Sequence, residues 1–397
     1  MKCISYLKYF VVLLSAGLLS VLAGCGGGGG TSTTGTLKLA LTDAPSCGYD
    51  HVYVTVDRVR VHQSTDAQDS DAGWSEVVLN SARKIDLLEL TNGVLEELGQ
   101  TALPAGHYTQ MRLVLVSNSV TPFANSVVPS GGSETELDTP SGQQTGLKMN
   151  VNIDVAADKV ADFVLDFNAC KSVVTAGKSG KYNLKPVVSV IPRLSDAGQR
   201  IVGYVDLGVA ATAAVSVQSA GVIVKATQPD SNGQFVLYPV PAGSYDLVVT
   251  APGHVTALIS GVPVINTAYT FVGSASNAIL PPTSATSEVA DGTVSVGGSV
   301  ADTLATVRAL QTYTGGTVVE VAGMPVDAVS GAYAFTLPVD APAYTTYNAN
   351  TAVTIAFTQD DPRAGRFNLE ASAPGQTPQL SLEINLGSGP STTNFTF

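Results

Sequence analysis

The stretch HVYVTVDRVRVHQ, at residues 51–63, decides the fold of the first part of this chain. Valines occupy alternate positions from Val52 to Val56, which is typical of a strand with one buried face. From Val59 to Val61 the valines continue, but one position out of phase. Because strand side chains alternate strictly between faces, this slip predicts a β-bulge near Asp57-Arg58.

The opposite face of the same strand is polar. It is expected to be a solvated outer sheet face, with a binding surface as the alternative. The residues expected on it are His51, Tyr53, Thr55, Arg58, Arg60 and His62.

A polar loop, residues 63–73, leads from this strand to Trp74. It contains Asp66, Asp69 and Asp71 ahead of Gly73, which suggests a calcium loop. The loop lacks the order of ligands and the distal Glu that an EF-hand needs, so an exposed hairpin tip is the favoured interpretation.

Several motifs of the first 193 residues occur together in order. They are Leu41-Thr42-Asp43-Ala44-Pro45, Val52 to Val59, Ile85-Asp86-Leu87-Leu88, Pro104 to Leu113, and Leu165-Asp166-Phe167-Asn168-Ala169-Cys170. Over residues 36–193 these motifs resemble the bacterial family of domains of unknown function numbered 4382. The resemblance implies an extracytoplasmic lipoprotein domain without an established activity, and it offers no catalytic residues.

A second unit, residues 200–275, follows the linker Ser195-Asp196-Ala197-Gly198. Its turn Asp230-Ser231-Asn232-Gly233 and its run Pro241-Ala242-Gly243-Ser244-Tyr245 are similar to the carboxypeptidase regulatory-like (transthyretin-like) β-sandwich. Asn-Gly supplies a turn with positive φ, and Pro-Ala-Gly a second corner. The resemblance implies a carbohydrate-binding-like sandwich fold without a peptidase centre.

The same pair of corners occurs in the first unit, as Asn92-Gly93 and Pro104-Ala105-Gly106-His107-Tyr108. A third unit, residues 293–397, echoes the second but lacks the Pro-Ala-Gly-x-Tyr corner, so we interpret it as a divergent sandwich. The expected fold class is therefore mainly β, with tandem antiparallel β-sandwich domains.

The N-terminus predicts export. After Lys2 and Lys8, residues 9–22 are apolar but too short for a permanent membrane span of about 20 residues. Leu22-Ala23-Gly24-Cys25 resembles the bacterial lipobox, which implies a cleaved signal peptide at 1–24 and diacylglycerol on Cys25. An ordinary signal peptide is the alternative.

Residues 25–35 are Gly-rich and predict a flexible tether after the lipidated cysteine. The residue after Cys25 is Gly26 and not Asp. By resemblance to enteric lipoprotein sorting, this favours an outer-membrane lipoprotein.

Four cysteines are present, of which Cys3 leaves with the signal and Cys25 takes lipid. In an oxidising compartment, Cys47 and Cys170 are then expected to form a disulfide. A metal or catalytic thiol is the rival interpretation, but no second Cys or His lies at ligand spacing from either residue.

Charge and motifs exclude several functions. The net charge of −12 makes nucleic acid a poor partner, and 13% charged residues argue against long disordered acidic tails. The four histidines form no zinc pair, no nucleophile elbow or nucleotide-binding loop occurs, and no cofactor is implied. The third unit has no Lys for a Lys–Asn isopeptide bond, and Lys225 is expected to be a solvated edge charge.

Three functions remain as hypotheses. The first is a non-catalytic cell-envelope scaffold, bound to the membrane by its lipid and to an envelope protein by its domains. The second is a carbohydrate-binding module that stacks aromatic side chains on a polysaccharide. The third is a glycan-cleaving enzyme with paired carboxylates. The aromatic candidates for the second are Trp74, Tyr204, Tyr238, Tyr245 and Tyr313, although for most of them a place in the core or at its rim is the favoured interpretation.

Overall fold

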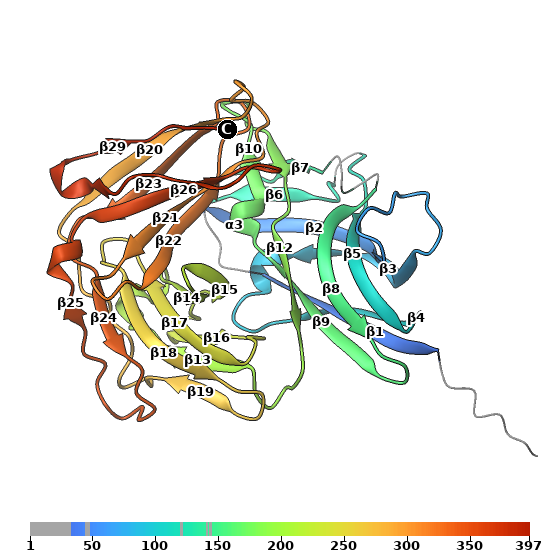
Figure 1. Cartoon of the computed structure of the whole chain (residues 1–397), viewed down its shortest axis with the longest axis horizontal. Coiled ribbons are helices and arrows are strands. Elements are labelled where there is room, and N and C mark those ends of the chain that lie inside the picture. Colours follow the sequence, from blue (N-terminus) through green and yellow to red (C-terminus); the bar gives the residue numbers. More distant parts are fainter. Residues whose placement is uncertain (1–32, 44–47, 120–121, 140–141, 143–144) are drawn as a thin grey trace, which may run out of the picture.

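The structure is a computed structural model that describes residues 33–43, 48–119, 122–139, 142 and 145–397. The signal segment, Cys25 and Cys47 lie outside these residues. The chain builds a mainly β structure in three parts, whose strands follow one another from right to lower left to upper left in Figure 1.

The first domain has two sheets. The smaller has the strand order β12-β9-β1-β4, in which β1 pairs parallel with β9 and antiparallel with β4. Its strands are β1 (Thr34–Asp43), β4 (Glu96–Pro104), β9 (Val160–Phe167) and β12 (Val188–Pro192).

The larger sheet has the order β10-β11-β7-β6-β2-β5-β8, with β3 also paired to β2. A 3₁₀ turn, η1 (Leu87–Glu89), follows β3, and the short helix α3 (Ala169–Ser172) precedes β10. Its strands are β2 (Tyr49–His62), β3 (Ser75–Asp86), β5 (Gly106–Leu115), β6 (Ser126–Pro129), β7 (Thr135–Asp138), β8 (Leu147–Val155), β10 (Val173–Thr175) and β11 (Tyr182–Leu184).

The bulge predicted in β2 is confirmed. The register of β2 against both β3 and β5 shifts between Val56 and Arg58. This shift turns the valines on both sides of it toward one core, and Val52, Val54, Val56, Val59 and Val61 are all fully buried.

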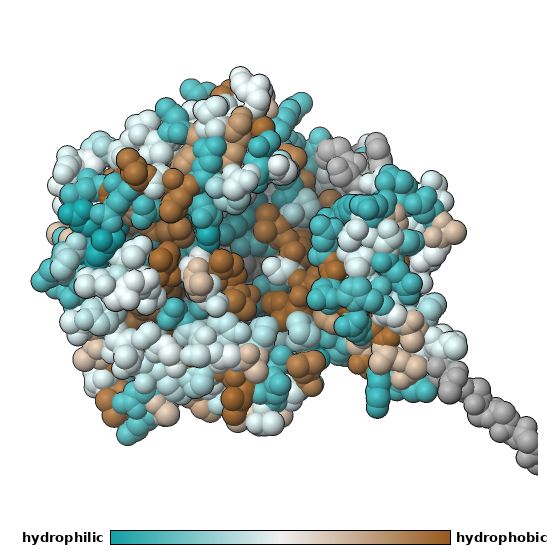
Figure 2. All heavy atoms as spheres, viewed as in Figure 1, coloured by the Kyte–Doolittle hydropathy of each residue, from teal (hydrophilic) through white to brown (hydrophobic). Residues whose placement is uncertain are grey.

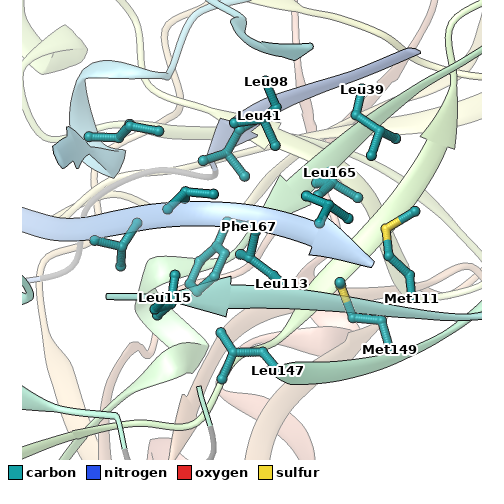
Figure 3. Packing of buried hydrophobic residues seen from close by; sticks show 14 of the residues in the cluster. Leu39, Leu41, Leu98, Met111, Leu113, Leu115, Leu147, Met149, Leu165 and Phe167 are labelled. Carbon is teal, nitrogen blue, oxygen red and sulfur yellow. The ribbon is translucent and has the colours of Figure 1, made fainter. Parts of the chain in front are cut away.

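The two sheets of the first domain pack face to face around an apolar core. Figure 3 shows Leu39 and Leu41 of β1 and Phe167 of β9 near Met111 and Leu113 of β5. These side chains come from opposite sheets, so the domain is a sandwich, as expected.

The second domain pairs a three-stranded sheet, β16-β13-β19, with a six-stranded sheet, β15-β14-β17-β18-β24-β25. A short helix, α4 (Leu207–Ala210), follows β13. The strands are β13 (Arg200–Tyr204), β14 (Ala214–Ser219), β15 (Val222–Thr227), β16 (Gln234–Leu237), β17 (Gly243–Thr250), β18 (Ala257–Val264), β19 (Tyr269–Val272), β24 (Ala343–Thr346) and β25 (Thr358–Gln359).

Strands β24 and β25 come from the third unit of the sequence. Strand β24 pairs parallel with β18, so the sheet of the second domain continues into residues that follow 293. The tandem sandwiches are mainly antiparallel, and parallel pairs join strands that lie far apart in the sequence.

The third domain pairs β23-β20-β29, with β30 also on β20, against β22-β21-β26-β27, with β28 also on β26. Its 3₁₀ turns are η2 (Asp361–Arg363) and η3 (Leu386–Ser388). Its strands are β20 (Ser287–Ser295), β21 (Thr306–Thr312), β22 (Val318–Pro325), β23 (Ala332–Pro338), β26 (Arg366–Ser372), β27 (Gln379–Leu380), β28 (Ile384–Asn385), β29 (Ser391–Thr392) and β30 (Phe395–Thr396).

The Pro-Ala-Gly-x-Tyr corner has the same geometry in the first two domains. The hydroxyl of Tyr108 donates to the carbonyl of Pro104 at 3.0 Å, and that of Tyr245 donates to Pro241 at 2.9 Å. Each bond ties the start of a strand to the residue four positions before it, in the manner of a tyrosine corner.

Removing either corner hydroxyl should weaken the fold. Tyr108→Phe and Tyr245→Phe should each lower the free energy of unfolding by about 1 kcal/mol, the value of one buried hydrogen bond. Urea unfolding of each variant measures this loss. Tyr344→Phe, at a ring that is 42% exposed, is the control, and an equal loss there would contradict the role of the corners.

Candidate functional site

The five aromatic residues predicted from the sequence are not brought together. Tyr238 and Tyr313 are only 2% and 4% exposed, so both lie in the core, the position favoured for most of these residues, and do not form a ligand surface. Their hydroxyls form hydrogen bonds within the protein. Tyr238 donates to Asp196, and Tyr313 donates to the carbonyl oxygens of Thr256 and Ala343. Tyr245 is half-buried and committed to its corner.

Trp74 is held against the large sheet of the first domain. The guanidinium carbons of Arg60 and Arg112 lie 4.6 and 4.8 Å from its ring centroid, and its indole N–H donates to the carbonyl of Gln68. Such cation–π contacts stabilise the ring where it is and cover part of its surface. The aromatic ring therefore serves mainly to fasten the loop that precedes it.

That loop, residues 63–73, is held against strands β2 and β5 of the large sheet. Ala67 is 3% exposed, and its carbonyl accepts from Arg112 at 2.8 Å. Asp69 forms an ion pair with Arg60. Across the described part of the chain, no group of three or more His, Cys, Asp or Glu side chains is placed to hold a metal ion.

The polar face of β2 is filled by contacts among its own side chains. His51 Nδ1 lies 2.5 Å from Asp86 Oδ2, and the His51 ring stacks on Tyr53. Lys84 Nζ lies 4.6 Å from the centroid of Tyr53 and also contacts Glu134. The hydrogen bond to Asp86 raises the pKa of His51 above the ordinary histidine value.

Replacing Asp86 should lower the titration midpoint of His51. The pKa of His51 is raised on folding, so its pair with Asp86 stabilises the fold below the unfolded pKa and ceases to do so as the pH rises through the folded pKa. Asp86→Asn keeps the shape but removes the charge. NMR titration should show a lower midpoint for His51.

An unchanged midpoint of His51 in Asp86→Asn would show that the carboxylate does not set its pKa.

Lys225 corrects a sequence-based expectation. It was expected to be a solvated edge charge, but it is 1% exposed and pairs with Asp166 of β9 in the first domain. The reason is that the first domain covers β15, the edge strand that carries it. Burial raises the pKa of Asp166, and Lys225 opposes that shift.

Glu320 of β22 joins all three domains. Its carboxylate accepts from Lys171 of the first domain and lies 3.5 Å from Arg308 Nη1 of the third. Its backbone N–H and carbonyl bond the side chain of Gln218, which is fully buried in β14 of the second domain, at 2.7 and 2.8 Å. Arg308 also donates to the carbonyl of Gly221 in the second domain.

The predicted turn at Asn92-Gly93 is confirmed, with φ of 57° and 79°, and it has a further role. The side chain of Asn92 accepts from the N–H of Val236 and donates to the carbonyl of Gln234, so it covers the edge of β16. A Cβ on Gly93 would lie 2.8 Å from Val236 Cγ1, so only glycine allows this approach. The sequence predicted the turn but not its contact with β16 of the second domain.

Lys225→Met should lower the free energy of unfolding by about 3–5 kcal/mol near pH 8, because it leaves Asp166 buried and unpaired. Without the lysine, the folded pKa of Asp166 rises further above its unfolded value, so folding takes up a proton. The deficit should therefore shrink as the pH falls toward about 4, the unfolded pKa of Asp.

Urea unfolding at several pH values tests this dependence. Lys38→Met is the matched control, because the side chain of Lys38 is 33% exposed and its two ion pairs are solvated. A deficit for Lys225→Met that stays constant between pH 8 and pH 5 would contradict the assignment.

A cleft of 770 Å³ lies between the first and third domains, and its charged lining residues include Lys148, Lys171, Lys185 and Asp302. Lys185 Nζ lies 3.8 Å from Asp302, and burial lowers the pKa of Lys185. Figure 2 shows apolar side chains gathered in the hollow between the first domain and the other two. The charges of the cleft are largely paired within the protein, so it presents no concentrated charge to a ligand.

The outer face of the three-stranded sheet is different. Ile201, Phe235 and Val272 of this sheet point into the core and are at most 2% exposed. The alternate residues therefore point outward. We call this surface the aromatic face, made up of Arg200, Val202 and Tyr204 on β13 and Tyr269 and Phe271 on β19. The sequence analysis identified Tyr204, but it missed Tyr269 and Phe271, whose alternation YTFV marks a strand with an aromatic outer face.

Two predictions involve residues outside the described part of the chain. Cys25 and Cys47 both lie there. Lipidation of Cys25 and pairing of Cys47 with Cys170, which lies in α3, stay predictions. Among the described helices, none has the length and apolar character needed to cross a membrane.

Comparison with known proteins identifies the first domain. Residues 34–186 match the family described as domain of unknown function (DUF4382). The match ends before the second domain, which begins at β13. No curated protein matches the chain.

Solved structures give low similarities. A chain of a type II cohesin–X-dockerin complex from Acetivibrio cellulolyticus is 23% identical with a TM-score of 0.18, over 22% of this chain and 59% of that one. The Bacillus anthracis TIE protein is 11% identical with a TM-score of 0.17, over 92% and 51%. A streptococcal ancillary pilin is 8% identical with a TM-score of 0.17, over 91% and 98%. Similarities at this level say nothing specific about the arrangement or function of this chain.

Proposed function

We propose that this protein is an exported lipoprotein that acts as a non-catalytic scaffold in the bacterial cell envelope. Lipid on Cys25 and the Gly-rich tether would hold it at the outer membrane, and its three domains would present one continuous surface to an envelope protein. The observation that carries the proposal is the junction at Glu320, where side chains from all three domains meet.

A rigid array is what distinguishes a scaffold from a string of independent modules. Domains joined only by linkers move relative to one another by default. Here Lys225 is a buried charge whose partner Asp166 lies in the first domain, and the buried Glu320 pairs with Lys171 of the first domain as well as with Arg308 of its own. Separating the domains would break the pairs with the first domain, and that loss favours one fixed arrangement. Surfaces far apart in the sequence then keep a constant spacing for a partner.

Glu320→Gln should loosen the array and change what the protein contacts in cells. The substitution removes the charge that faces Lys171 and Arg308 while keeping the side-chain size. The measurement is formaldehyde crosslinking of cells that express the full chain, followed by comparison of the crosslinked adducts. We expect Glu320→Gln to lose at least one adduct that the unaltered protein forms.

Glu136→Gln is the matched control, since Glu136 is an exposed carboxylate on β7. Faster proteolysis at the linker 193–199 would show that Glu320→Gln has loosened the domains. An unchanged adduct pattern in a loosened variant, or turnover of a polysaccharide by the purified protein, would contradict the non-catalytic scaffold. Release of Cys25→Ala from the membrane fraction tests the anchor separately.

A further inference from the structure

The aromatic face has two large rings exposed on one strand. Tyr269 and Phe271 of β19 are 41% and 49% exposed, with ring centroids 6.4 Å apart and planes tilted by 54°. Val202 lies beside Phe271 in the paired strand β13 and is half-buried. Two exposed aromatic rings over an apolar side chain form a shallow apolar surface, and such surfaces mark binding sites more often than chance exposure does.

A cationic side chain borders these rings. The guanidinium carbon of Arg200 lies 4.3 Å from the ring centroid of Tyr238 and 5.1 Å from that of Tyr269. Its Nε is buried and has no hydrogen-bond partner among the described residues. Arg200 as a whole is half-buried, so the two rings cover its side chain only in part.

The first domain leaves this part of the sheet open. The turn at Asn92-Gly93 covers the edge of β16, at the far side of the sheet from β19. Strand β19 pairs only with β13 and ends the sheet. A ligand would therefore lie across β13 and β19, where the rings and Arg200 are.

We propose that the aromatic face binds a neutral polysaccharide. A pyranose ring has apolar C–H faces that pack on aromatic rings, and hydroxyl groups at its edge that donate and accept hydrogen bonds. Tyr269 and Phe271 supply the rings. The half-buried guanidinium of Arg200, beside Tyr269, supplies hydrogen-bond donors.

Neutral sugar fits better than acidic sugar because the chain carries a net charge of −12, which repels polyanions. The inference deepens the proposed function and rests on it in one respect, the assumption that the protein binds rather than cleaves its ligand. It names polysaccharide as a class of partner for the scaffold.

Affinity electrophoresis of the full chain in detergent tests the proposal. The gels contain soluble starch, laminarin or xyloglucan as neutral probes, and alginate or polygalacturonate as acidic ones. At least one neutral polysaccharide should retard the protein. Phe271→Ala and Tyr269→Ala should each weaken binding by about three- to tenfold, the value of one aromatic contact, and the double variant should abolish retardation.

Tyr344→Ala is the matched control, because its ring on β24 is 42% exposed and lies outside the aromatic face. It should leave retardation unchanged. Since all three rings are exposed, urea unfolding should show that every variant remains folded.

Three outcomes would overturn the proposal: no retardation by any neutral probe, retardation that the ring variants do not weaken, or binding of acidic probes alone. A protein strand added to the edge of β19 is the alternative occupant. Ring variants that lose crosslinked adducts in cells, with no retardation in any gel, would indicate that alternative. Failure in the gels leaves the adduct pattern of Glu320→Gln unaffected, so the two proposals fail separately.

Discussion

The arrangement of the domains depends on the junction at Glu320, the one residue described above that contacts all three. Glu320 is 5% exposed, and the cations that face it come from two different domains. Gln218 of the second domain bonds both the N–H and the carbonyl of the same residue, as a neighbouring strand would. A buried charge is tolerated only with partners in place, so the three domains must be correctly oriented before Glu320 can be buried.

Polar interfaces of this kind specify an arrangement more than they strengthen it. An apolar contact allows sliding because it has no preferred direction, whereas a buried ion pair or amide bond is satisfied in only one register. Lys225 with Asp166 and Asn92 with Val236 each fix one point between the first and second domains. Together with Glu320, they define the relative orientation of all three sandwiches.

The sequence predicted features that depend on neighbouring residues. The bulge in β2 followed from the valine phase slip, and the corners at Tyr108 and Tyr245 followed from a shared motif. It did not predict contacts between domains, because a lysine in a strand pattern looks the same whether water or another domain covers it. Lys225 was misplaced for this reason.

The candidate aromatic face was predicted only in part, for a related reason. Aromatic residues in strands pack inside or outside according to the register of the sheet, and a single sequence does not reveal the register. Tyr204 and Tyr238 looked equivalent in the sequence, yet one lies on the outer face and the other is buried. The alternation YTFV puts Tyr269 and Phe271 on one face of β19, and the burial of Thr270 and Val272 makes that face the outer one.

The pairing of β24 with β18 has a consequence for how the protein is made. A chain is synthesised from its N-terminus, so β18 is available long before residues 343–346 arrive. Until then the second sandwich has an open edge, which is a template for pairing with other nascent chains. Its folding must therefore wait for, or be protected until, the C-terminal part of the chain has been made. A protein built in this way matures late, and as a unit rather than domain by domain.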